Sequence, residues 1–585
     1  MYRGVVMSGY IYVPPTANNY PGLDRGFNQR YTLENDLTET NGEGVYLASS
    51  TDDVLNALID INNNHTPLSG EIRVISGGHC YEDFTFNRRD TSSTSNKTRF
   101  VIDLSNMRNI DEVTINGTDY ITVEPGASNW LIQQTLHSKY GAALPGGSCY
   151  SVCAGGHISG GGYGLLSRLH GLTVDYLAGV EMVIPDRTAG FALRTFDESD
   201  SDSLNWASRG GGAGHFGVIT KYYFRKDKVP AAPERALFVA LPVPWSQFAD
   251  NTNGAGADNF TRFMQAYYTA TSKLPGQAFT LGKFTFMTAT TDVMSIVMQV
   301  VYGDNSGHSH TIGGVDIDPI TTQAGAQEVI RSFWSELDEW IVEPETSQWH
   351  KQRFNLIGHP VSAQVALDTV YDLPWIDMTQ LLNGSGENQK GKYKSSYMIT
   401  NFTGNEAASI YEFLTDTQTD NVAPVSADTS QTLIQIDSYG LQINKMDSGH
   451  DGNTAVAARN SLLKTQYQTY WKTLEGTTPA QALQIETDIV TWFNLGYNNI
   501  HLSATDGASS FPVWGNKYQG CYFNYPDRQL GVNDGYAADP GASYGNFLGI
   551  YFGGSVAYQL NEIKAKVDPG NVFSHSQSVL NVSSS

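Results

Sequence analysis

The stretch from Gly141 to Gly164 constrains this chain more than any other, because it holds nine glycines. Glycine loses more backbone entropy on folding than any other residue, so this stretch predicts no long helix or strand. Large side chains are interleaved with the glycines, among them Tyr150, Val152, Ile158 and Tyr163, which disfavours an exposed flexible loop. The glycine spacing does not match the G-x-G-x-x-G dinucleotide fingerprint. Such a run is typical of backbone that lies directly against a flat or polyanionic ligand.

A second glycine motif ends a predicted strand near the start of the chain, in Arg73-Val-Ile-Ser-Gly77-Gly78-His79. Two adjacent glycines leave the backbone bare, so its amide groups can approach a phosphate closely. Taken alone, two glycines after a strand more often form only a turn. If the turn does hold a ligand, His79 lies beside it.

A third segment near the end of the chain reads Cys521-Tyr-Phe-Asn-Tyr-Pro-Asp527. Strand periodicity predicts Cys521, Phe523 and Tyr525 on one face, with Tyr522 and Asn524 on the other. From pattern alone, this segment is an aromatic edge strand stopped by a proline.

Composition excludes some functions. Lys+Arg 36 against Asp+Glu 59 gives a net charge of −23, which repels nucleic acids and anionic membranes. No run of apolar residues is long enough to span a bilayer, and the first residues lack a signal peptide. A mature secreted form looks the same, so the compartment stays open. Four cysteines are too few for a disulfide scaffold. We expect a soluble acidic enzyme with no metal site; its oligomeric state stays open.

The pattern of predicted elements changes along the chain. Short strands and helices alternate up to a strand at Val218–Phe224, which a linker follows. The middle of the chain combines long helices with alternating strands. There we expect helices at Ala326–Val342 and Ala455–Leu474, and strands at Phe279–Thr288, Met294–Tyr302 and Thr432–Gln442. We therefore expect an α+β fold with parts at residues 1–228, 229–505 and 506–585.

Together, the three motifs resemble the berberine-bridge-enzyme-like FAD-linked oxidases, and most closely the hexose-oxidising branch of that family. The resemblance runs in order from about Gly26 to Val579. It implies a two-domain FAD-linked oxidase fold of the vanillyl-alcohol-oxidase and p-cresol-methylhydroxylase type. Both chain ends then form the FAD domain, and the middle forms a substrate domain of antiparallel sheet covered by helices.

The resemblance also implies FAD held by two covalent bonds. One joins His79 to the flavin 8α-carbon, and the other joins the sulfur of Cys149 to flavin C6. Cys153 is a rival thiol, because the family usually has glycine or another small residue there; its register against Gly155 favours Cys149. The other implied cofactor contacts are Gly77, Gly78, Gly155, Gly156, His157, Gly160, Gly161, Val218 and Asn524.

For catalysis, the resemblance implies Tyr525 as the base that takes the hydroxyl proton, with Tyr163 as a second active-site tyrosine. A tyrosine has a pKa near 10 and needs a cation or hydrogen bonds to act near neutrality. Lys392 or Lys394 could supply that charge, although loop lysines are more often solvated. Asp437 is a further catalytic candidate, with the alternative that it only bonds neighbouring backbone. Candidate substrate-binding residues are Tyr522, Gln435 and Lys394.

The favoured function is therefore a carbohydrate oxidase that converts a sugar C1 hydroxyl to a lactone and reduces O₂ to H₂O₂. Val152 supports O₂ as acceptor, since the resemblance implies an oxygen cavity lined by the third residue after the linking cysteine. Three alternatives stay open: an oxidase of a secondary-metabolite alcohol or glycosylated natural product, a dehydrogenase with another acceptor, and a flavin-bearing binding protein with little turnover.

Overall fold

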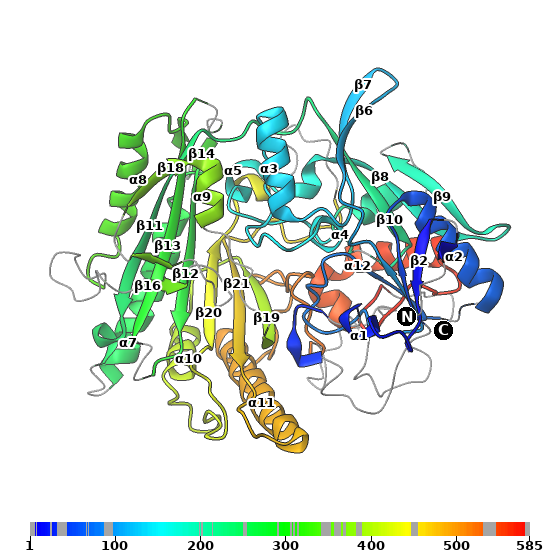
Figure 1. Ribbon diagram of the computed structural model, residues 1–585. Helices are drawn as coiled ribbons and strands as arrows, with labels where there is room; N and C mark the ends of the chain where they lie inside the picture. The colour runs from blue at the N-terminus through cyan, green and yellow to red at the C-terminus, as the bar shows by residue number, and fades with distance from the viewer. Residues whose placement is uncertain are drawn as a thin grey trace.

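The structure is a computed structural model. It describes residues 6–579 except 8, 24–25, 32–43, 66, 68, 87–97, 198, 200–202, 213, 250–253, 289–291, 305–306, 308–309, 313–314, 341–352, 356–363, 367–369, 382–388, 446–453 and 531–545. Figure 1 shows a large sheet with most of its helices on one side and two smaller sheets on the other.

Two five-stranded sheets lie in the part built by the chain ends. The first has the order β1 (Val6–Met7), β2 (Tyr10–Val13), β3 (Gly44–Leu47), β5 (Phe100–Asp103), β4 (Ile72–Ile75), and its β3, β5 and β4 are parallel. The second is antiparallel, in the order β6 (Ile110–Ile115), β7 (Thr118–Val123), β10 (Val218–Arg225), β8 (Leu177–Asp186), β9 (Gly190–Asp197).

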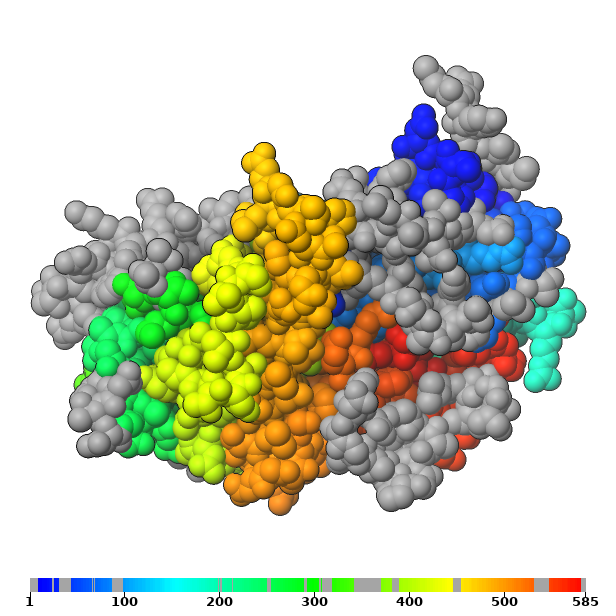
Figure 2. Space-filling model, turned by 90° about the horizontal axis from the view of Figure 1, so that it is seen from below, coloured from blue at the N-terminus to red at the C-terminus, as the bar shows by residue number. Residues whose placement is uncertain are grey.

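Helices connect and cover these two sheets. They are α1 (Tyr20–Leu23), α2 (Thr51–His65), α3 (Asn129–Tyr140), α4 (Ala154–Ser159), α5 (Ser167–His170), α6 (Leu204–Ser208) and, from the C-terminal end, α12 (Asn546–Val567). Val54, Leu58 and Ile61 of α2 are fully buried, at the spacing that places them on one helix face. Figure 2 shows the blue N-terminal and red C-terminal parts side by side at the same end of the molecule.

The middle of the chain forms a seven-stranded antiparallel sheet. Its order is β18 (Tyr371–Pro374), β11 (Arg235–Pro244), β13 (Val293–Tyr302), β12 (Ala278–Thr285), β20 (Leu433–Ser438), β21 (Leu463–Trp471), β19 (Lys390–Met398). Two small hairpins accompany it, β14 (His310–Ile312) with β15 (Val315–Ile317) and β16 (Arg353–Asn355) with β17 (Gln364–Ala366). The expected α+β fold and antiparallel middle sheet are confirmed.

Five helices belong to this middle sheet: α7 (Ala255–Ser272), α8 (Gln323–Ser335), α9 (Trp375–Leu381), α10 (Gly404–Leu414) and α11 (Pro479–Ala504). Tyr267 of α7 donates its hydroxyl to the Ile436 carbonyl at 2.9 Å, and Tyr497 of α11 donates to the Ser395 carbonyl at 2.9 Å. The opposite face of the sheet is turned towards the part built by the chain ends, and α9 lies on that side, where the Trp375 ring is 6.2 Å from the His137 ring of α3. The boundaries 228/229 and 505/506 stay a prediction.

The expected helix at Ala455–Leu474 is wrong, because residues 463–471 form strand β21. This strand pairs with β19 on one side and β20 on the other, and all its residues are buried. Its alternating Thr, Gln and Tyr residues suit a strand buried on both faces better than a helix. The helix expected at Ala326–Val342 is α8, which ends at Ser335.

Candidate functional site

One large cavity lies between the chain-end sheets and the polar face of the middle sheet. Most of the predicted site residues line it: Gly77, Gly78, His79, Cys149, Gly155, Gly156, His157, Tyr163, Gln435, Asp437, Tyr522, Asn524 and Tyr525. Val152, Cys153 and Gln466 line it as well. Residues more than 400 positions apart in the sequence thus meet around one space.

His79 is held rigidly at the end of the turn that follows β4. Its ring stacks on Phe27 with the centroids 4.3 Å apart, and its Nε2 lies 2.9 Å from Ser151 Oγ. Gly78 has φ +67°, a left-handed conformation that favours glycine. Burial lowers the pKa of His79 to about 4, so the imidazole is neutral and nucleophilic near pH 7.

Both candidate thiols line the cavity. Burial raises the pKa of Cys149 to about 11, while the charge of Lys464 acts in the opposite direction. Cys153 is the residue before α4, and burial raises its pKa to about 11 too. All four cysteines of the sequence are described, and none forms a disulfide. The choice between Cys149 and Cys153 therefore stays a prediction.

The glycines of the run have different structural roles. A Cβ at Gly155 would lie 2.7 Å from Ser76 Oγ, and one at Gly77 would lie 2.9 Å from the Cys153 nitrogen, so both allow close backbone packing. Gly156 lines the cavity and has no atom within 4 Å of its Cβ position, which leaves its backbone open. Gly160, by contrast, is not a lining residue: its Cβ would lie 2.0 Å from Asn524 Oδ1.

Two other predicted cofactor contacts also lie outside the cavity lining. Gly161 has φ +125° and follows α4. Val218 is fully buried in the hydrophobic core of the first sheet, whereas its neighbours Gly217 and Ile219 line the cavity. The side chain of Val218 thus contributes to the core.

The segment from Cys521 to Asp527 is not a strand, so the predicted alternation of its side chains is wrong. It turns, with the Tyr525 amide donating to the Tyr522 carbonyl at 2.9 Å. The turn directs Tyr522, Asn524 and Tyr525 to the same cavity. Asn524 Nδ2 then donates to the His157 carbonyl at 3.2 Å, which joins this turn to α4.

Lys464, a residue that the sequence analysis missed, contacts Tyr525. Its Nζ lies 3.3 Å from Tyr525 Oη and 2.9 Å from Asp437 Oδ2, and Gln435 Nε2 donates to Asp437 Oδ1 at 2.9 Å. The same ammonium lies 4.4 Å from the ring centre of Tyr163. Burial, followed by the Asp437 charge, raises the pKa of Tyr525 well above its ordinary value. An ammonium group in contact with the hydroxyl favours the phenolate.

Tyr163 and Tyr522 frame Tyr525. Tyr163 donates its hydroxyl to the Ser438 carbonyl at 2.8 Å, so that group is already engaged. The Tyr522 ring lies 4.9 Å from the Tyr525 ring at an interplanar angle of 80°, and its hydroxyl accepts from Asn524 Nδ2 at 3.1 Å. Burial raises the pKa of both tyrosines.

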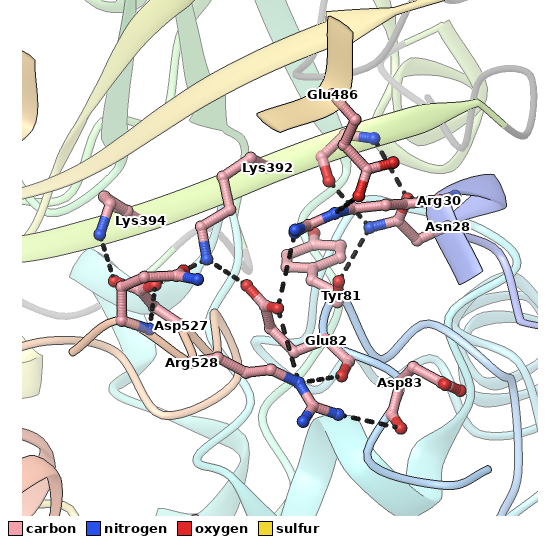
Figure 3. Close-up of polar contacts among 12 residues, drawn as sticks. Asn28, Arg30, Tyr81, Glu82, Asp83, Lys392, Lys394, Glu486, Asp527 and Arg528 are labelled. Carbon is pink, nitrogen blue, oxygen red and sulfur yellow. Dashed lines mark hydrogen bonds and ion pairs between the residues drawn. The ribbon is translucent and has the colours of Figure 1, made fainter. Parts of the chain in front are cut away.

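Lys392 and Lys394 are not the cations beside Tyr525, and Lys394 is not among the residues that line the cavity. Lys394 Nζ lies 2.5 Å from Asp527 Oδ2, and Lys392 Nζ lies 2.6 Å from Asp527 Oδ1. Strand alternation explains this: Lys394 is opposite Tyr467, on the face of the sheet that packs on α11, whereas Lys464 and Gln466 point to the other face. Both lysines belong to a buried ion cluster (Figure 3).

The cavity suits an FAD. His215 lines it and is fully buried, yet within the described residues neither ring nitrogen has a hydrogen-bond partner, as expected of a group that contacts a ligand. The open backbone at Gly156 and the neutral imidazole of His79 suit a flat, anionic cofactor. Among the described residues, no three His, Cys, Asp or Glu side chains are grouped to hold a metal, and no helix is long and apolar enough to cross a bilayer.

Comparisons with known proteins give the same assignment. Residues 43–189 match the family described as FAD binding domain, and residues 521–580 match the one described as berberine and berberine like. The chain is 32% identical to the hexose oxidase of Chondrus crispus, over 98% of this chain and 96% of that enzyme. It is 28% identical to the aclacinomycin-N/aclacinomycin-A oxidase of Streptomyces galilaeus, over 95% of this chain and 87% of that one.

A solved structure shares the fold over nearly the whole length. CrmK, a flavoenzyme involved in shunt product recycling in caerulomycin biosynthesis, is 26% identical and covers 98% of this chain and 99% of its own, with a TM-score of 0.72. The expected two-domain architecture is thereby confirmed. This chain is an FAD-linked oxidoreductase that belongs to the berberine-bridge-enzyme-like oxidase family.

Proposed function

We propose that the protein is an FAD-dependent carbohydrate oxidase that converts the C1 hydroxyl of a hexose or oligosaccharide to the lactone. The sugar loses two electrons and two protons, and O₂ takes them up as H₂O₂. The observation that carries this proposal is the hydrogen-bonded chain Lys464–Asp437–Gln435. Its Lys464 end contacts the hydroxyl of Tyr525, and Tyr525 lines the same cavity as His79.

Tyr525 is the proposed base. FAD supplies the hydride acceptor when bound, and the chain supplies the group that holds the hydroxyl proton. Only the phenolate of Tyr525 can accept the hydroxyl proton, and the raised pKa makes that form scarce at neutral pH. The Lys464 ammonium, 3.3 Å from Oη, favours the phenolate, which forms by release of the Tyr525 proton to solvent before substrate binds. Asp437 holds Lys464 in place, and its negative charge also opposes the phenolate. Asp437 thus sets how readily Tyr525 accepts a proton.

A polar wall supports a sugar as substrate. Gln435, Asp437 and Gln466 line the cavity from neighbouring strands, and amide and carboxylate groups of this kind pair well with sugar hydroxyls. Phe279 and Leu281 line the same space from β12 and can pack on a sugar ring face. A site built to hydrogen-bond hydroxyl groups discriminates strongly against analogues that lack them.

We further propose that His79 and Cys149 form the two covalent bonds to FAD. Each bond replaces one flavin C–H bond and one N–H or S–H bond, and O₂ takes up the two electrons and two protons released as H₂O₂. The neutral imidazole of His79 has a free electron pair at physiological pH. The Cys149 thiol has a raised pKa, and the charge of Lys464 shifts it towards the reactive thiolate. The remaining predicted contacts, Gly160, Gly161 and Val218 included, shape the backbone around this cavity.

Oxygen consumption and peroxide release across a panel of monosaccharides and oligosaccharides test the proposal. At least one aldose should give both signals in a molar ratio of one O₂ to one H₂O₂, and Tyr525→Phe should slow flavin reduction by roughly 10²–10⁴-fold, the usual contribution of a positioned base. If no sugar reduces the flavin anaerobically, the carbohydrate assignment is wrong.

A natural-product alcohol is the second candidate substrate. The chain matches an aclacinomycin oxidase over 95% of its length, and CrmK shares its fold over 98%. Polyketide and glycosylated alcohols therefore belong in the same panel. Flavin reduction by one of these and by no free sugar supports the second candidate. Fast reduction by a sugar followed by slow reoxidation in air, but rapid reoxidation by a dye, points to a dehydrogenase.

A further inference from the structure

One ammonium group joins the segment that carries His79 to the turn that carries Tyr525. Lys392, on β19 of the middle sheet, forms ion pairs with Glu82 and with Asp527 Oδ1, the latter at 2.6 Å (Figure 3). Glu82 is three residues after His79, and Asp527 is two residues after Tyr525. Lys392, Glu82 and Asp527 are all at most 2% exposed.

Both carboxylates are ionised in this cluster. Burial alone raises the pKa of Asp527, but Lys392 and Lys394 outweigh it and lower the value to about 2. Burial acts on Glu82 in the same way, and Lys392 and Arg30 lower its pKa below the ordinary value. Two buried carboxylates that share one ammonium hold it in a fixed position, because displacing it leaves a buried charge without compensation.

Further contacts fix each carboxylate from other directions. Lys394, two residues along β19, holds Asp527 Oδ2 at 2.5 Å. Arg30 joins the Glu82 side to α11 through Glu486, with Nε and Oε1 2.8 Å apart. Arg528 Nε donates to the Glu82 carbonyl at 2.9 Å, so the segments after His79 and after Tyr525 also meet directly.

The strand that bears Lys392 lies next to the one that bears Lys464. β19 and β21 are neighbours, with Lys392 opposite Thr469 and Tyr397 opposite Lys464. Asp527 is therefore anchored to β19, while the hydroxyl of Tyr525 meets Lys464 of β21. The same sheet therefore holds both partners of the Tyr525–Lys464 contact: β19 holds the turn that carries Tyr525, and β21 carries Lys464.

We propose that Lys392 is a positioning residue that aligns the attachment group His79 and the base Tyr525 with each other through Glu82 and Asp527. Lys392 contacts neither the cavity nor the reacting atoms. The Glu82 arm sets the place of His79 for cofactor attachment, and the Asp527 arm sets the place of Tyr525 for proton transfer. This inference rests on the proposed function, because it assigns roles to residues of that same site.

Four variants of the protein separate the two arms. Glu82→Gln should lower the share of chains that keep flavin after acid denaturation, and leave the rate of flavin reduction per bound flavin within a few-fold. Asp527→Asn should do the reverse, with reduction about 100-fold slower, since misplacement by about 1 Å at a reacting centre costs that much. Lys392→Met should lower both quantities, and Lys392→Arg should recover part of each.

Lys517→Met is the matched control, because Lys517 forms a largely buried pair with Glu406 at 2.6 Å and lies just past the C-terminal end of β19, where it donates to the Asn401 carbonyl. It should lower the melting temperature without changing attachment or the reduction rate. If Glu82→Gln and Asp527→Asn lose both quantities in parallel, or neither, the two-arm arrangement is wrong. These variants decide the matter even if Lys392→Met does not fold. Covalent attachment of flavin is measured without substrate, so the test of the Glu82 arm holds even if the proposed sugar substrate is wrong. A wild-type protein that holds no covalent flavin would instead overturn the proposal that His79 is an attachment residue.

Discussion

The contact between Lys464 and Tyr525 gives the sharpest test of the proposed base. Replacing Lys464 by Met removes the ammonium that lies 3.3 Å from Tyr525 Oη and keeps a side chain of similar length. The phenolate then loses its stabilising charge. Flavin reduction should slow, and its rise with pH should move to higher pH.

The distance sets the size of the effect. Two unit charges 3.3 Å apart attract by about 5 kcal/mol at an effective dielectric constant of about 20. Asp437 shares the ammonium at 2.9 Å, so we expect about half of that energy, ~2.5 kcal/mol, to reach the phenolate. At 1.36 kcal/mol per pKa unit, this corresponds to a roughly 70-fold slower reduction at a pH below the rise.

The rate of flavin reduction and the pH at which it rises are measured by anaerobic stopped flow. Flavin bleaching is followed at saturating substrate across a pH series. Lys464→Arg keeps the charge and should stay near wild type. The double variant Lys464→Met/Asp437→Asn removes the buried carboxylate that the single variant leaves unpaired, and so separates loss of folding from loss of charge. A Lys464→Met rate within three-fold of wild type, with the pH rise unmoved, would refute the reasoning.

Three further predictions concern the cofactor, the acceptor and stability. Acid-denatured protein should stay yellow, and Cys149→Ala should keep a single bond through His79; loss of the second bond in Cys153→Ala instead would reverse the choice of thiol. Val152 lines the cavity, and Val152→Leu should slow reoxidation of reduced flavin by O₂ while sugar-driven reduction stays nearly unchanged; equal reoxidation rates would remove its proposed role. Folding lowers the pKa of Asp527 from 3.8 to about 2, which contributes about 2 kcal/mol to the free energy of unfolding. This contribution is complete above about pH 4 and is lost as the pH falls to 2, so the difference in unfolding free energy between wild type and Asp527→Asn should narrow over that range. A difference that stays constant would contradict this prediction.

Local pattern was enough to predict much of the fold. The strand expected at Met294–Tyr302 lies within one residue of β13, the one expected at Val218–Phe224 lies within one residue of β10, and the strand expected before Gly77 is β4. The glycine run at Gly141–Gly164 also predicted backbone that lies close to a ligand. These features depend on neighbouring residues only, so a single sequence contains them. That His79 and Cys149 share one site was implied by the family resemblance and not by local pattern.

Lys464 was missed because its segment was assigned the wrong periodicity. In the expected helix at Ala455–Leu474, Lys464 and Gln466 lie two residues apart on different faces. In β21 the same two residues share one face, where Gln466 lines the cavity and Lys464 contacts Tyr525. Alternation of Thr, Gln and Tyr from Thr465 to Tyr470 was the signal that could have shown the strand. For Lys392 and Lys394, the partners Glu82 and Asp527 are far away in sequence, and no local pattern predicts such pairs.

The contact between Gly160 and Asn524 also sets an order of events during synthesis. The segment that matches the FAD binding domain is complete at residue 189, but Asn524, Tyr525 and His575 close the same cavity from the last part of the chain. The ribosome therefore releases the glycine-rich run long before its cavity exists. A chain shortened before residue 521 lacks the lining residues Asn524, Tyr525 and His575, so we expect cofactor loading to follow the synthesis of this last part.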